Sequence, residues 1–329
     1  MMIHIDEFQK VRALVIGDLM IDEYLWGSVD RISPEAPVMV VSVEKETHTL
    51  GGAGNVINNL KAMGAKVEAI GTAGTGSAGR MISEKLEALG IPTDGIISEP
   101  DRPTTRKTRV LAANQQVLRI DREIRKSITR ESFDQLVPIM AKKIPEADVV
   151  ILSDYDKGLI TGPLVKETVR LAKEHGIRVL ADPKALDFTK YERVSILTPN
   201  RKEAGLAAHM DIRSREDLIR AGHKIMALAR LEKLLITCGK DGMMLFETGE
   251  EPFAIASKAR QVFDVSGAGD TVIALLGLGL ALGASFRDSA RVANEAAGIV
   301  VGKVGTATAS IEELRDALAD SHLLKKESP

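Results

Sequence analysis

Short apolar runs alternate with amphipathic helical patterns along most of the chain, and this alternation constrains the fold more than any other feature. The first run, Arg12-Ala-Leu-Val-Ile-Gly17, is apolar on consecutive positions, which is typical of a strand buried on both faces. Similar runs occur at 67–70, 149–152, 179–181, 195–197 and 233–237, and helical patterns at 55–63, 81–89, 163–175, 218–231 and 271–282. This order predicts an α/β fold with a doubly wound, mostly parallel sheet flanked by helices.

Two segments depart from this rhythm. Residues 22–50 and 103–122 alternate polar and apolar positions, and within the second segment 104–111 and 115–121 flank a turn at 112–114. Such alternation predicts antiparallel β-structure. We therefore expect one domain over 1–329, with these two segments inserted as a small β lid. The lid would cover the carboxyl ends of the parallel strands, where open α/β sheets bind ligands, although an irregular edge insertion is the alternative.

Composition excludes several classes of protein. The 329 residues carry a net charge of −2, which argues against a nucleic-acid binder, and 3% aromatic residues are too few for a base-stacking platform. A single cysteine, Cys238, excludes a disulfide framework and suits the reducing cytoplasm. The first ten residues lack the apolar core of a signal peptide. The longest uncharged stretch, 271–286, falls short of the ~20 residues that span a bilayer and predicts a buried helix instead.

The segment Gly74-Thr-Gly-Ser-Ala-Gly79 matches the glycine spacing of a dinucleotide-binding turn, with Asp94 following 20 residues after Gly74. Two observations argue against a nicotinamide cofactor. The motif follows the second predicted strand rather than the first, and Asp94 precedes the next apolar run instead of closing it. A glycine-rich turn without a cofactor is the preferred interpretation, and a nicotinamide-dependent oxidoreductase remains the alternative.

The segment Asp264-Val-Ser-Gly-Ala-Gly-Asp270 leads directly into the apolar helical pattern. Its small residues allow the backbone to approach a ligand, and the helix dipole adds roughly half a positive charge at that end. An anion such as a transferring phosphoryl group would be stabilised there. A carboxylate at Asp270 would be placed to accept a proton from an attacking hydroxyl, although an acid in the first turn of a helix also complements the dipole alone.

Two further motifs extend this hypothesis. In Asn200-Arg-Lys-Glu203 the first and last side chains share a helix face and suit a hydrated Mg²⁺, although a helix-capping pair has the same spacing. Thr237-Cys-Gly-Lys-Asp-Gly242 follows a predicted strand, and its glycines would allow a nucleotide to approach closely. An ordinary hairpin turn has the same pattern.

Acids and an amide lie near the first strand. Asp18 and Asp22 flank a turn, and Gly51-Gly-Ala-Gly-Asn55 opens the next helix. Such groups at strand ends are suited to sugar hydroxyls, and a paired acidic metal site is the competing interpretation. The chain lacks the G-x-x-x-x-G-K-[ST] sequence, which excludes a P-loop kinase, and its six histidines lack the spacing of a zinc protease.

Taken in order, the motifs at 51–55, 198–203, 237–242 and 264–270 resemble those of the ribokinase-like (PfkB) carbohydrate kinases, over nearly the whole chain. Within that family the closest resemblance is to kinases of D-glycero-β-D-manno-heptose 7-phosphate. It rests on the segments 17–24, 116–121, 152–158, 182–184 and 187–188, and above all on Arg31-Ile-Ser-Pro-Glu-Ala-Pro-Val38.

The resemblance implies a role for each matching residue. Asp270 would remove the proton of the anomeric hydroxyl, and the backbone N–H groups of Gly267, Ala268 and Gly269 would bind the γ-phosphoryl group. Asn200 and Glu203 would hold Mg²⁺, partly through water, and the implied ATP site consists of Thr237, Gly239, Gly242, Asn294, Asn200 and Glu203. Asp264 and Ser266 would bind a monovalent cation such as K⁺. The implied sugar site consists of Asp18, Asp22, Gly52 and Asn55.

The implied reaction converts ATP and heptose 7-phosphate into heptose 1,7-bisphosphate and ADP, a step towards nucleotide-activated heptose for lipopolysaccharide. The distal phosphate needs a basic partner. The candidates in or beside the lid are Arg31, Arg106, Lys107, Arg109, Arg119 and Lys157, of which Arg106 and Lys157 are our prediction.

Other interpretations stay open. A kinase of another sugar, such as ribose or fructose 6-phosphate, has the same motifs, and a non-catalytic sugar-binding regulator is a further alternative. The exposed edges of the lid predict a homodimer. Bifunctional relatives continue into a nucleotidyltransferase domain with an H-x-G-H motif that is not found here, so the chain is either a monofunctional kinase or a separated domain.

Overall fold

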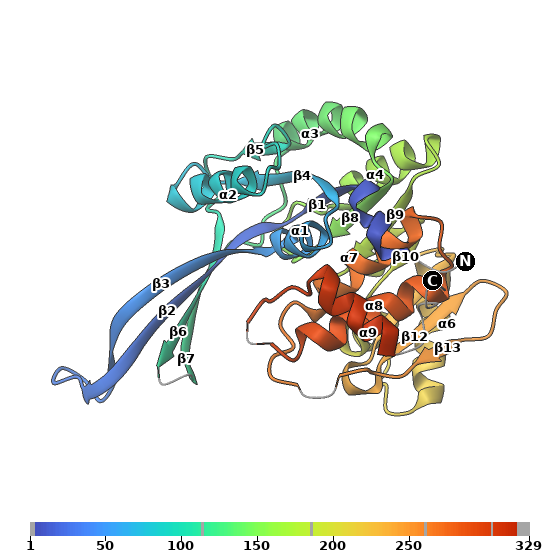
Figure 1. Ribbon diagram of the computed structural model, residues 1–329. Coiled ribbons are helices and arrows are strands. Elements are labelled where there is room, and N and C mark those ends of the chain that lie inside the picture. Colours follow the sequence, from blue (N-terminus) through green and yellow to red (C-terminus); the bar gives the residue numbers. More distant parts are fainter. Residues whose placement is uncertain (1–3, 113–114, 185–186, 260–261, 304, 321–329) are drawn as a thin grey trace, which may run out of the picture.

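The computed structural model describes residues 4–112, 115–184, 187–259, 262–303 and 305–320, and its main sheet has nine strands in the order β13-β12-β11-β10-β9-β8-β1-β4-β5 (Figure 1). The strands are β1 (Arg12–Gly17), β4 (Lys66–Ala73), β5 (Ile96–Ser98), β8 (Val149–Ser153), β9 (Arg178–Asp182), β10 (Ile196–Leu197), β11 (Lys233–Thr237), β12 (Met243–Glu247) and β13 (Phe253–Ile255). All pairings from β5 to β11 are parallel, and β12 and β13 are antiparallel. The predicted doubly wound, mostly parallel sheet is confirmed.

Helices cover both faces of this sheet, because consecutive strand residues point to opposite sides. On β1, Ala13 and Val15 belong to one hydrophobic core, and Leu14 and Ile16 belong to another. The first core includes residues of α1 (Ala53–Ala62), α2 (Ser77–Ala88), α7 (Ala268–Ala281), α8 (Phe286–Val300) and α9 (Ile311–Asp320). The second includes α3 (Arg130–Lys143), α4 (Gly162–Glu174), α5 (Arg201–Ala208) and α6 (Arg215–Leu228). Short 3₁₀ helices occur at η1 (Ile5–Lys10), η2 (Ile144–Glu146), η3 (Phe188–Tyr191) and η4 (Gly239–Asp241).

Helix α7 is the buried helix that the longest uncharged stretch predicted. Every residue from Asp270 to Leu280 is buried, because α7 lies between the sheet, α1 and α8. This explains why its sequence has no polar face. Among the described helices, none has the length and apolar character needed to cross a bilayer.

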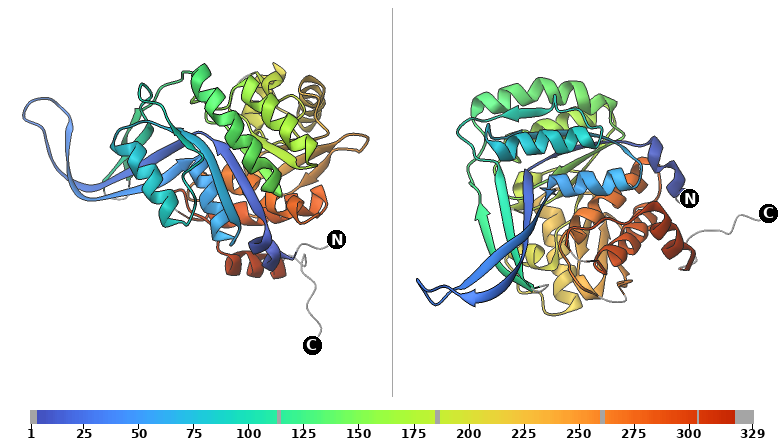
Figure 2. Two further views of the ribbon diagram at one scale, coloured as in Figure 1. Left: turned by 90° about the horizontal axis from the view of Figure 1, so that it is seen from above. Right: turned by 60° about the vertical axis from the view of Figure 1, so that its left-hand side comes forward.

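The lid is a second sheet of four strands, in the order β3-β2-β6-β7. Its strands are β2 (Leu19–Ile32), β3 (Met39–Gly52), β6 (Thr105–Ala112) and β7 (Gln115–Arg122). Figures 1 and 2 show it standing off the main body, with the β2–β3 hairpin projecting farthest. Because these strands pair into a regular sheet of their own, the two segments form a small β lid rather than an irregular insertion.

The prediction of a purely antiparallel lid was wrong in one respect. The pairs β2–β3 and β6–β7 are antiparallel, but the central pair β2–β6 is parallel. Each antiparallel pair joins strands that are consecutive in the sequence, whereas β2 and β6 start separate excursions that leave the main domain in the same direction. Residues 113–114 of the turn predicted at 112–114 lie outside the described residues.

Candidate active site

A cavity of about 750 Å³ lies at the carboxyl ends of β8 to β11, facing the beginning of α7. This volume is within the usual range of small-molecule sites. The cavity collects predicted residues from segments far apart in the sequence: Asn200, Glu203, Thr237, Gly239, Gly242, Gly267, Ala268, Gly269, Asp270 and Asn294. The predicted residues of the sugar and cation sites do not line this cavity and are described separately below.

Asp270 is a buried carboxylate of the cavity, at 3% exposed. It lies in the first turn of α7 and accepts hydrogen bonds from Asn55 Nδ2 at 2.7 Å and from the Tyr155 hydroxyl, which is 2.8 and 2.9 Å from its two oxygens. Burial raises the pKa of Asp270 to about 6, although these two donors oppose the shift. Asp270 is therefore ionised at neutral pH and is a proton acceptor close to its operating range.

Two polar contacts join α1 to the start of α7. Asn55 of α1 holds Asp270, and one turn later Asn59 Oδ1 accepts a 2.8 Å hydrogen bond from the Thr271 hydroxyl. Asn55 is 1% exposed, and its Oδ1 has no hydrogen-bond partner among the described residues. An unpaired buried acceptor costs about 1–3 kcal/mol, so this oxygen is suited to a donor that a ligand brings.

Asp18 has a different function from the one that the resemblance implies. Its carboxylate accepts the backbone N–H groups of Tyr155, Lys157 and Leu159, at 2.9, 3.1 and 3.2 Å. Burial, followed by the charge of Asp154, raises the pKa of Asp18 to about 6. Because backbone donors bind both oxygens, Asp18 fixes the turn that carries Tyr155 to Asp270 rather than facing the cavity itself.

The start of α7 provides the predicted anion site. Gly267 is the N-cap residue, with φ of +81°, and the N–H groups that open a helix have no partner within it. One of the three predicted donors is already used, because the Ala268 N–H bonds the Val265 carbonyl at 3.3 Å. The N–H groups of Gly267 and Gly269 are therefore the main candidates for binding the γ-phosphoryl group. A Cβ at position 267 would lie 2.5 Å from Asn55 Nδ2, so this position excludes any side chain.

Asn200 and Glu203 form a capping box at the start of α5. Asn200 Oδ1 accepts the Glu203 N–H at 3.0 Å, and Glu203 Oε2 accepts the Asn200 N–H at 3.0 Å. The capping interpretation is therefore correct, yet both residues also line the cavity. The second Glu203 oxygen, Oε1, accepts a 2.7 Å hydrogen bond from Lys184 Nζ.

Asp182, at the end of β9, lies between these groups. Its Oδ2 is 3.8 Å from the position that a Cβ of Gly269 would occupy. Burial and the charges of Asp270 and Glu203 raise its pKa well above the usual value. The site therefore places three carboxyl groups and the Lys184 ammonium in one small volume.

The remaining cavity residues suit a nucleotide. An isolated parallel bridge sets Asn200 beside Thr237, and η4 joins β11 to β12 as a hairpin through Gly239 and Gly242. The turn at 237–242 therefore connects a hairpin and also forms part of the cavity wall. Asn294, on α8, donates a 2.9 Å bond to the Ala256 carbonyl. The far wall is aliphatic and consists of Met243, Val262, Val265, Val272, Ala297 and Val301.

Asp264 and Ser266 lie just outside the cavity, in the loop before α7. Asp264 Oδ1 accepts the Ser266 N–H at 2.9 Å, and Asp264 Oδ2 accepts the Gly305 N–H at 3.2 Å. The backbone contact with Ser266 lowers the pKa of Asp264 in opposition to its partial burial. Asp264 therefore links two loops that border the start of α7.

Asp22 lies within electrostatic range of Asp270, because its charge contributes to the raised pKa of Asp270. Its Oδ1 accepts a 2.5 Å bond from Arg109, which also stacks on the Tyr24 ring at 5.3 Å. The absence of a side chain at Gly51 makes room for Asp22, since a Cβ there would be 2.3 Å from Asp22 Oδ2. Gly52 has φ of +58° and turns the chain into α1.

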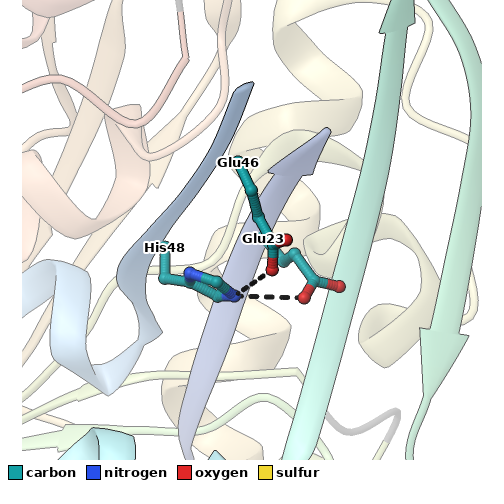
Figure 3. Close-up of side chains that lie close together, drawn as sticks. All are labelled: Glu23, Glu46 and His48. Atoms are coloured by element: carbon teal, nitrogen blue, oxygen red, sulfur yellow. Dashed lines mark hydrogen bonds and ion pairs between the residues drawn. The ribbon is translucent and has the colours of Figure 1, made fainter. Parts of the chain in front are cut away.

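Arg106 lies on the opposite face of the lid, contrary to the prediction that it binds substrate. Strand residues alternate in direction, so Glu23 and Arg106 face away from Asp22. Figure 3 shows Glu23 there with Glu46 and His48, whose Nε2 is 3.1 and 3.0 Å from the two carboxylates. Arg106 Nη1 is 3.5 Å from the same Glu23 oxygen, and Thr108 donates to the other one. Arg106 thus offsets part of the negative charge of this group, which joins β2, β3 and β6.

Lys157 and Lys107 meet at one carboxylate, Glu123. Their ammonium groups are 3.1 and 3.7 Å from Glu123 Oε2, and Lys107 is also 3.8 Å from Asp121. Lys157 belongs to the turn held by Asp18, and Lys107 alternates with Arg106, so it lies on the Asp22 face of the lid. The two lysines converge from the main domain and the lid.

Two of the three glycines of the 74–79 turn, Gly74 and Gly79, serve packing. A Cβ at Gly74 would be 2.2 Å from the Arg102 carbonyl, and one at Gly79 would be 1.8 Å from the Gly74 carbonyl. Asp94, the acid that follows the motif in the sequence, is paired with Lys143 at 2.9 Å. These contacts account for the motif without a dinucleotide.

Sequence reasoning assigned no role to Tyr155, Lys184 or Asp182, and it did not select Asn59 or Thr271. The segments 152–158 and 182–184 supported the resemblance to the family, but no functional role was assigned to these three residues within them. A signal was present, because both segments follow parallel strands at the edge where such sheets bind ligands. The Asn59–Thr271 pair left no signal, because its residues are 212 positions apart.

Comparisons with known proteins agree with this arrangement. "Bifunctional protein HldE" of Desulfatibacillum aliphaticivorans is 54% identical over 313 residues, which cover 95% of this chain and 64% of that protein. The protein of the same name from Geobacter sulfurreducens is 47% identical over 312 residues, with coverages of 95% and 64%. The chain thus spans about 64% of the length of these curated relatives.

Solved structures share the fold. Arabidopsis thaliana ribokinase, solved with ribose and ATP, matches with a TM-score of 0.73 at 21% identity, over 94% of this chain and 98% of that one. Phosphofructokinase-2 of Escherichia coli, solved with potassium, matches with a TM-score of 0.79 at 18% identity, over 95% and 99%. The fold is therefore ribokinase-like. The profile of the pfkB family of carbohydrate kinases matches residues 11–314, so the chain belongs to the pfkB carbohydrate kinase family.

Proposed function

We propose that the chain is an ATP-dependent kinase that phosphorylates the anomeric hydroxyl of D-glycero-β-D-manno-heptose 7-phosphate. The products would be heptose 1,7-bisphosphate and ADP, in the synthesis of nucleotide-activated heptose for lipopolysaccharide. One observation carries the kinase chemistry: a buried carboxylate with a pKa of about 6 lies at the start of a buried helix, beside an unpaired Asn55 oxygen. The choice of heptose rests on the resemblance of segments such as 31–38.

In the proposed reaction Asp270 is the general base. The anomeric oxygen attacks the γ-phosphorus, its proton passes to Asp270, and the bond from that phosphorus to the β,γ-bridging oxygen breaks, so that ADP leaves with the electron pair. Asn55 and Tyr155 hold the carboxylate in place. The unpaired Asn55 Oδ1 supplies an acceptor for a second sugar hydroxyl, which supports a polyhydroxyl substrate.

The beginning of α7 would stabilise the transferred group. The N–H groups of Gly267 and Gly269, with the positive end of the helix dipole, lie beside Asp270 in the same cavity. Phosphoryl transfer leaves little covalent work for a protein, so positioning and charge stabilisation carry the rate.

The residues fit a hydrated Mg²⁺ that arrives with the nucleotide. Glu203 lines the cavity, and its Oε1 accepts a hydrogen bond from Lys184. Mg²⁺ commonly takes one or two carboxylates while it keeps several waters. Asn200 and Glu203 would hold the ion through water. It would supply positive charge to the phosphate oxygens.

We also propose binding sites for the adenine and for the monovalent cation. The aliphatic wall near Asn294, together with Thr237, Gly239 and Gly242, suits the adenosine part of ATP. Asp264 and Ser266 border the loop that holds the start of α7, and we assign the proposed K⁺ site there. The test for this ion is the rate in K⁺ compared with Na⁺ at equal ionic strength.

The distal phosphate would bind between Lys107 and Lys157. These two cations converge from the lid and the main domain, whereas Arg106 is turned away. We propose that Asp22 and Asn55 hold sugar hydroxyls, with Gly52 beside them at the start of α1. Asp18 would act indirectly, through the turn at 155–159.

We further propose that the chain acts in the cytoplasm as a homodimer joined through its lid, with 1–329 as one domain. Large apolar side chains are exposed on the lid, at Ile32, Val38, Met39, Val43, Leu118 and Ile120. Exposed apolar patches of this kind mark interaction sites, and the edge strands β3 and β7 offer unpaired backbone groups.

ADP release from Mg-ATP, measured against heptose 7-phosphate, fructose 6-phosphate, ribose and a blank without sugar, tests the assignment. We expect turnover with the heptose phosphate alone, in K⁺ buffer. Turnover confined to another sugar would keep the kinase and discard the heptose. No turnover with any sugar would contradict the proposed function.

A further inference from the structure

We propose that Lys184 is a catalytic residue: its ammonium group leaves Glu203 when the nucleotide binds and contacts the transferring γ-phosphoryl group. This inference rests on the phosphoryl transfer proposed above, but not on which sugar accepts the group. No role had been assigned to Lys184 from the sequence.

The position of Lys184 is the first argument. It follows β9 in Asp182-Pro-Lys184 and lines the cavity with a half-exposed side chain. Its Nζ is 2.7 Å from Glu203 Oε1, on the proposed phosphate side of the site. It also lies within electrostatic range of Asp270, because each residue contributes to the pKa shift of the other. Lys184 therefore contacts Glu203, the carboxylate proposed to hold Mg²⁺, and lies within electrostatic range of Asp270, the proposed base.

The charge balance is the second argument. Carboxyl groups from three elements act on this ammonium: Asp182 at the end of β9, Glu203 on α5 and Asp270 on α7. A γ-phosphoryl group would otherwise approach these acids without a protein cation beside it. Of the other cations lining the described part of the cavity, Arg201 is paired with Asp241 at 2.8 Å, and Lys202 and Lys240 are exposed. The charge of Lys184 acts on Asp270, so Lys184 is placed to offset the negative charge next to the base.

The third argument is that Lys184 can leave its partner. The capping box holds Glu203 through Oε2, so α5 keeps its start when Oε1 is released. A lysine side chain has a flexible four-carbon stem and a point charge, and it needs no fixed planar geometry. A triphosphate presents more negative charge than one carboxylate, so the ammonium would turn towards it and leave Glu203 Oε1 to the hydrated cation.

The experiment compares nucleotide binding in the absence of sugar. Calorimetry would measure the Kd of Mg-ADP and of a β,γ-imido ATP analogue for wild type, Lys184→Met, Lys184→Arg and the control Lys173→Met, an exposed residue of α4 outside the cavity. We expect Lys184→Met to weaken analogue binding about tenfold more than ADP binding, because only the analogue carries a γ-phosphate. Lys184→Arg should recover most of this preference, and Lys173→Met should match wild type.

Turnover with the accepted sugar gives the second readout. Loss of one cation at the developing charge should lower kcat about 10²- to 10³-fold with little change in the KM of the sugar. Equal losses of ADP and analogue affinity would show a structural role through α5, and unchanged binding of both would also overturn the proposal. If Lys184→Met does not fold, the same comparison with Lys184→Gln decides. Because the binding comparison uses no sugar, an incorrect sugar assignment leaves it valid.

Discussion

At the scale of single residues, burial determines the chemistry of the site. Asp270 and Asp18 are both buried, and the pKa of each is raised to about 6, yet their partners differ. Three backbone N–H groups bind Asp18 and make it a structural anchor, whereas side chains bind Asp270 inside the cavity. The same residue type therefore has two functions, according to what it touches.

Replacement of the proposed base gives the first prediction. Asp270→Asn should abolish turnover while Mg-ATP still binds, because the amide keeps the shape but accepts no proton. The control is Asp134→Asn, at an exposed position of α3, which should retain full activity. Steady-state kinetics and calorimetry together measure both effects. Full activity of Asp270→Asn would remove Asp270 as the base.

The same replacement should stabilise the fold at neutral pH. Folding raises the pKa of Asp270 from 3.8 to about 6, so between these values the folded state binds more protons than the unfolded state. The free energy of unfolding therefore falls as the pH rises through this window, by about 3 kcal/mol at most. Asp270→Asn removes this penalty, so its Tm should exceed that of wild type at pH 7 and approach it near pH 4. A lower Tm at pH 7 would contradict the burial argument.

The pH dependence of catalysis follows from the same shift. The base must be ionised, so kcat/KM should fall about tenfold per pH unit below about pH 6. Tyr155 and Asn55 donate to Asp270, while the charges of Asp22 and Lys184 act on it in opposite directions. Stopped assays between pH 4.5 and 8, with saturating Mg-ATP, measure this limb. An acidic limb centred below pH 4.5 would show that another group limits the rate.

At the scale of elements, the start of α7 joins backbone conformation to function. Gly267 has φ of +81°, and its missing Cβ makes room for the Asn55 amide, 2.5 Å from where that atom would be. Helix α1 can approach α7 only because of this gap. The two helices then align Asn55 with Asp270 and Asn59 with Thr271.

A matched pair of glycines separates the cost of the left-handed backbone from the displacement of Asn55. Gly267→Ala and Gly249→Ala place alanine at nearly equal φ, +81° and +83°, but no atom lies within 4 Å of a Cβ at 249. Both variants should lose about 1–2 kcal/mol of stability from the left-handed backbone. Only Gly267→Ala should also lower kcat, by at least about tenfold, because it displaces Asn55. Equal kinetics in the two variants would show that the Asn55 contact is dispensable.

At the scale of the whole molecule, more than half of the exposed large apolar side chains in the described part of the chain lie on the lid. Leu118 and Ile120 on β7 are 54% and 42% exposed, on a strand at the edge of the lid sheet. Leu118→Glu combined with Ile120→Glu should turn a dimer into a monomer at micromolar concentration, as measured by light scattering. Leu228→Glu, on α6 with 41% exposure, is the control and should remain dimeric. A monomeric wild type would refute the dimer.

The sequence by itself determined the layered α/β fold, because strands buried on both faces and amphipathic helices carry local patterns. It also located the residues at the strand ends, since parallel strands bring their carboxyl ends to one edge. It did not determine that β2 and β6 run parallel, that Arg106 faces away from Asp22, or that Lys184 meets Glu203. These depend on which segments become neighbours in space. Such contacts join residues as far apart as Asn55 and Asp270, and only packing of the complete chain selects them.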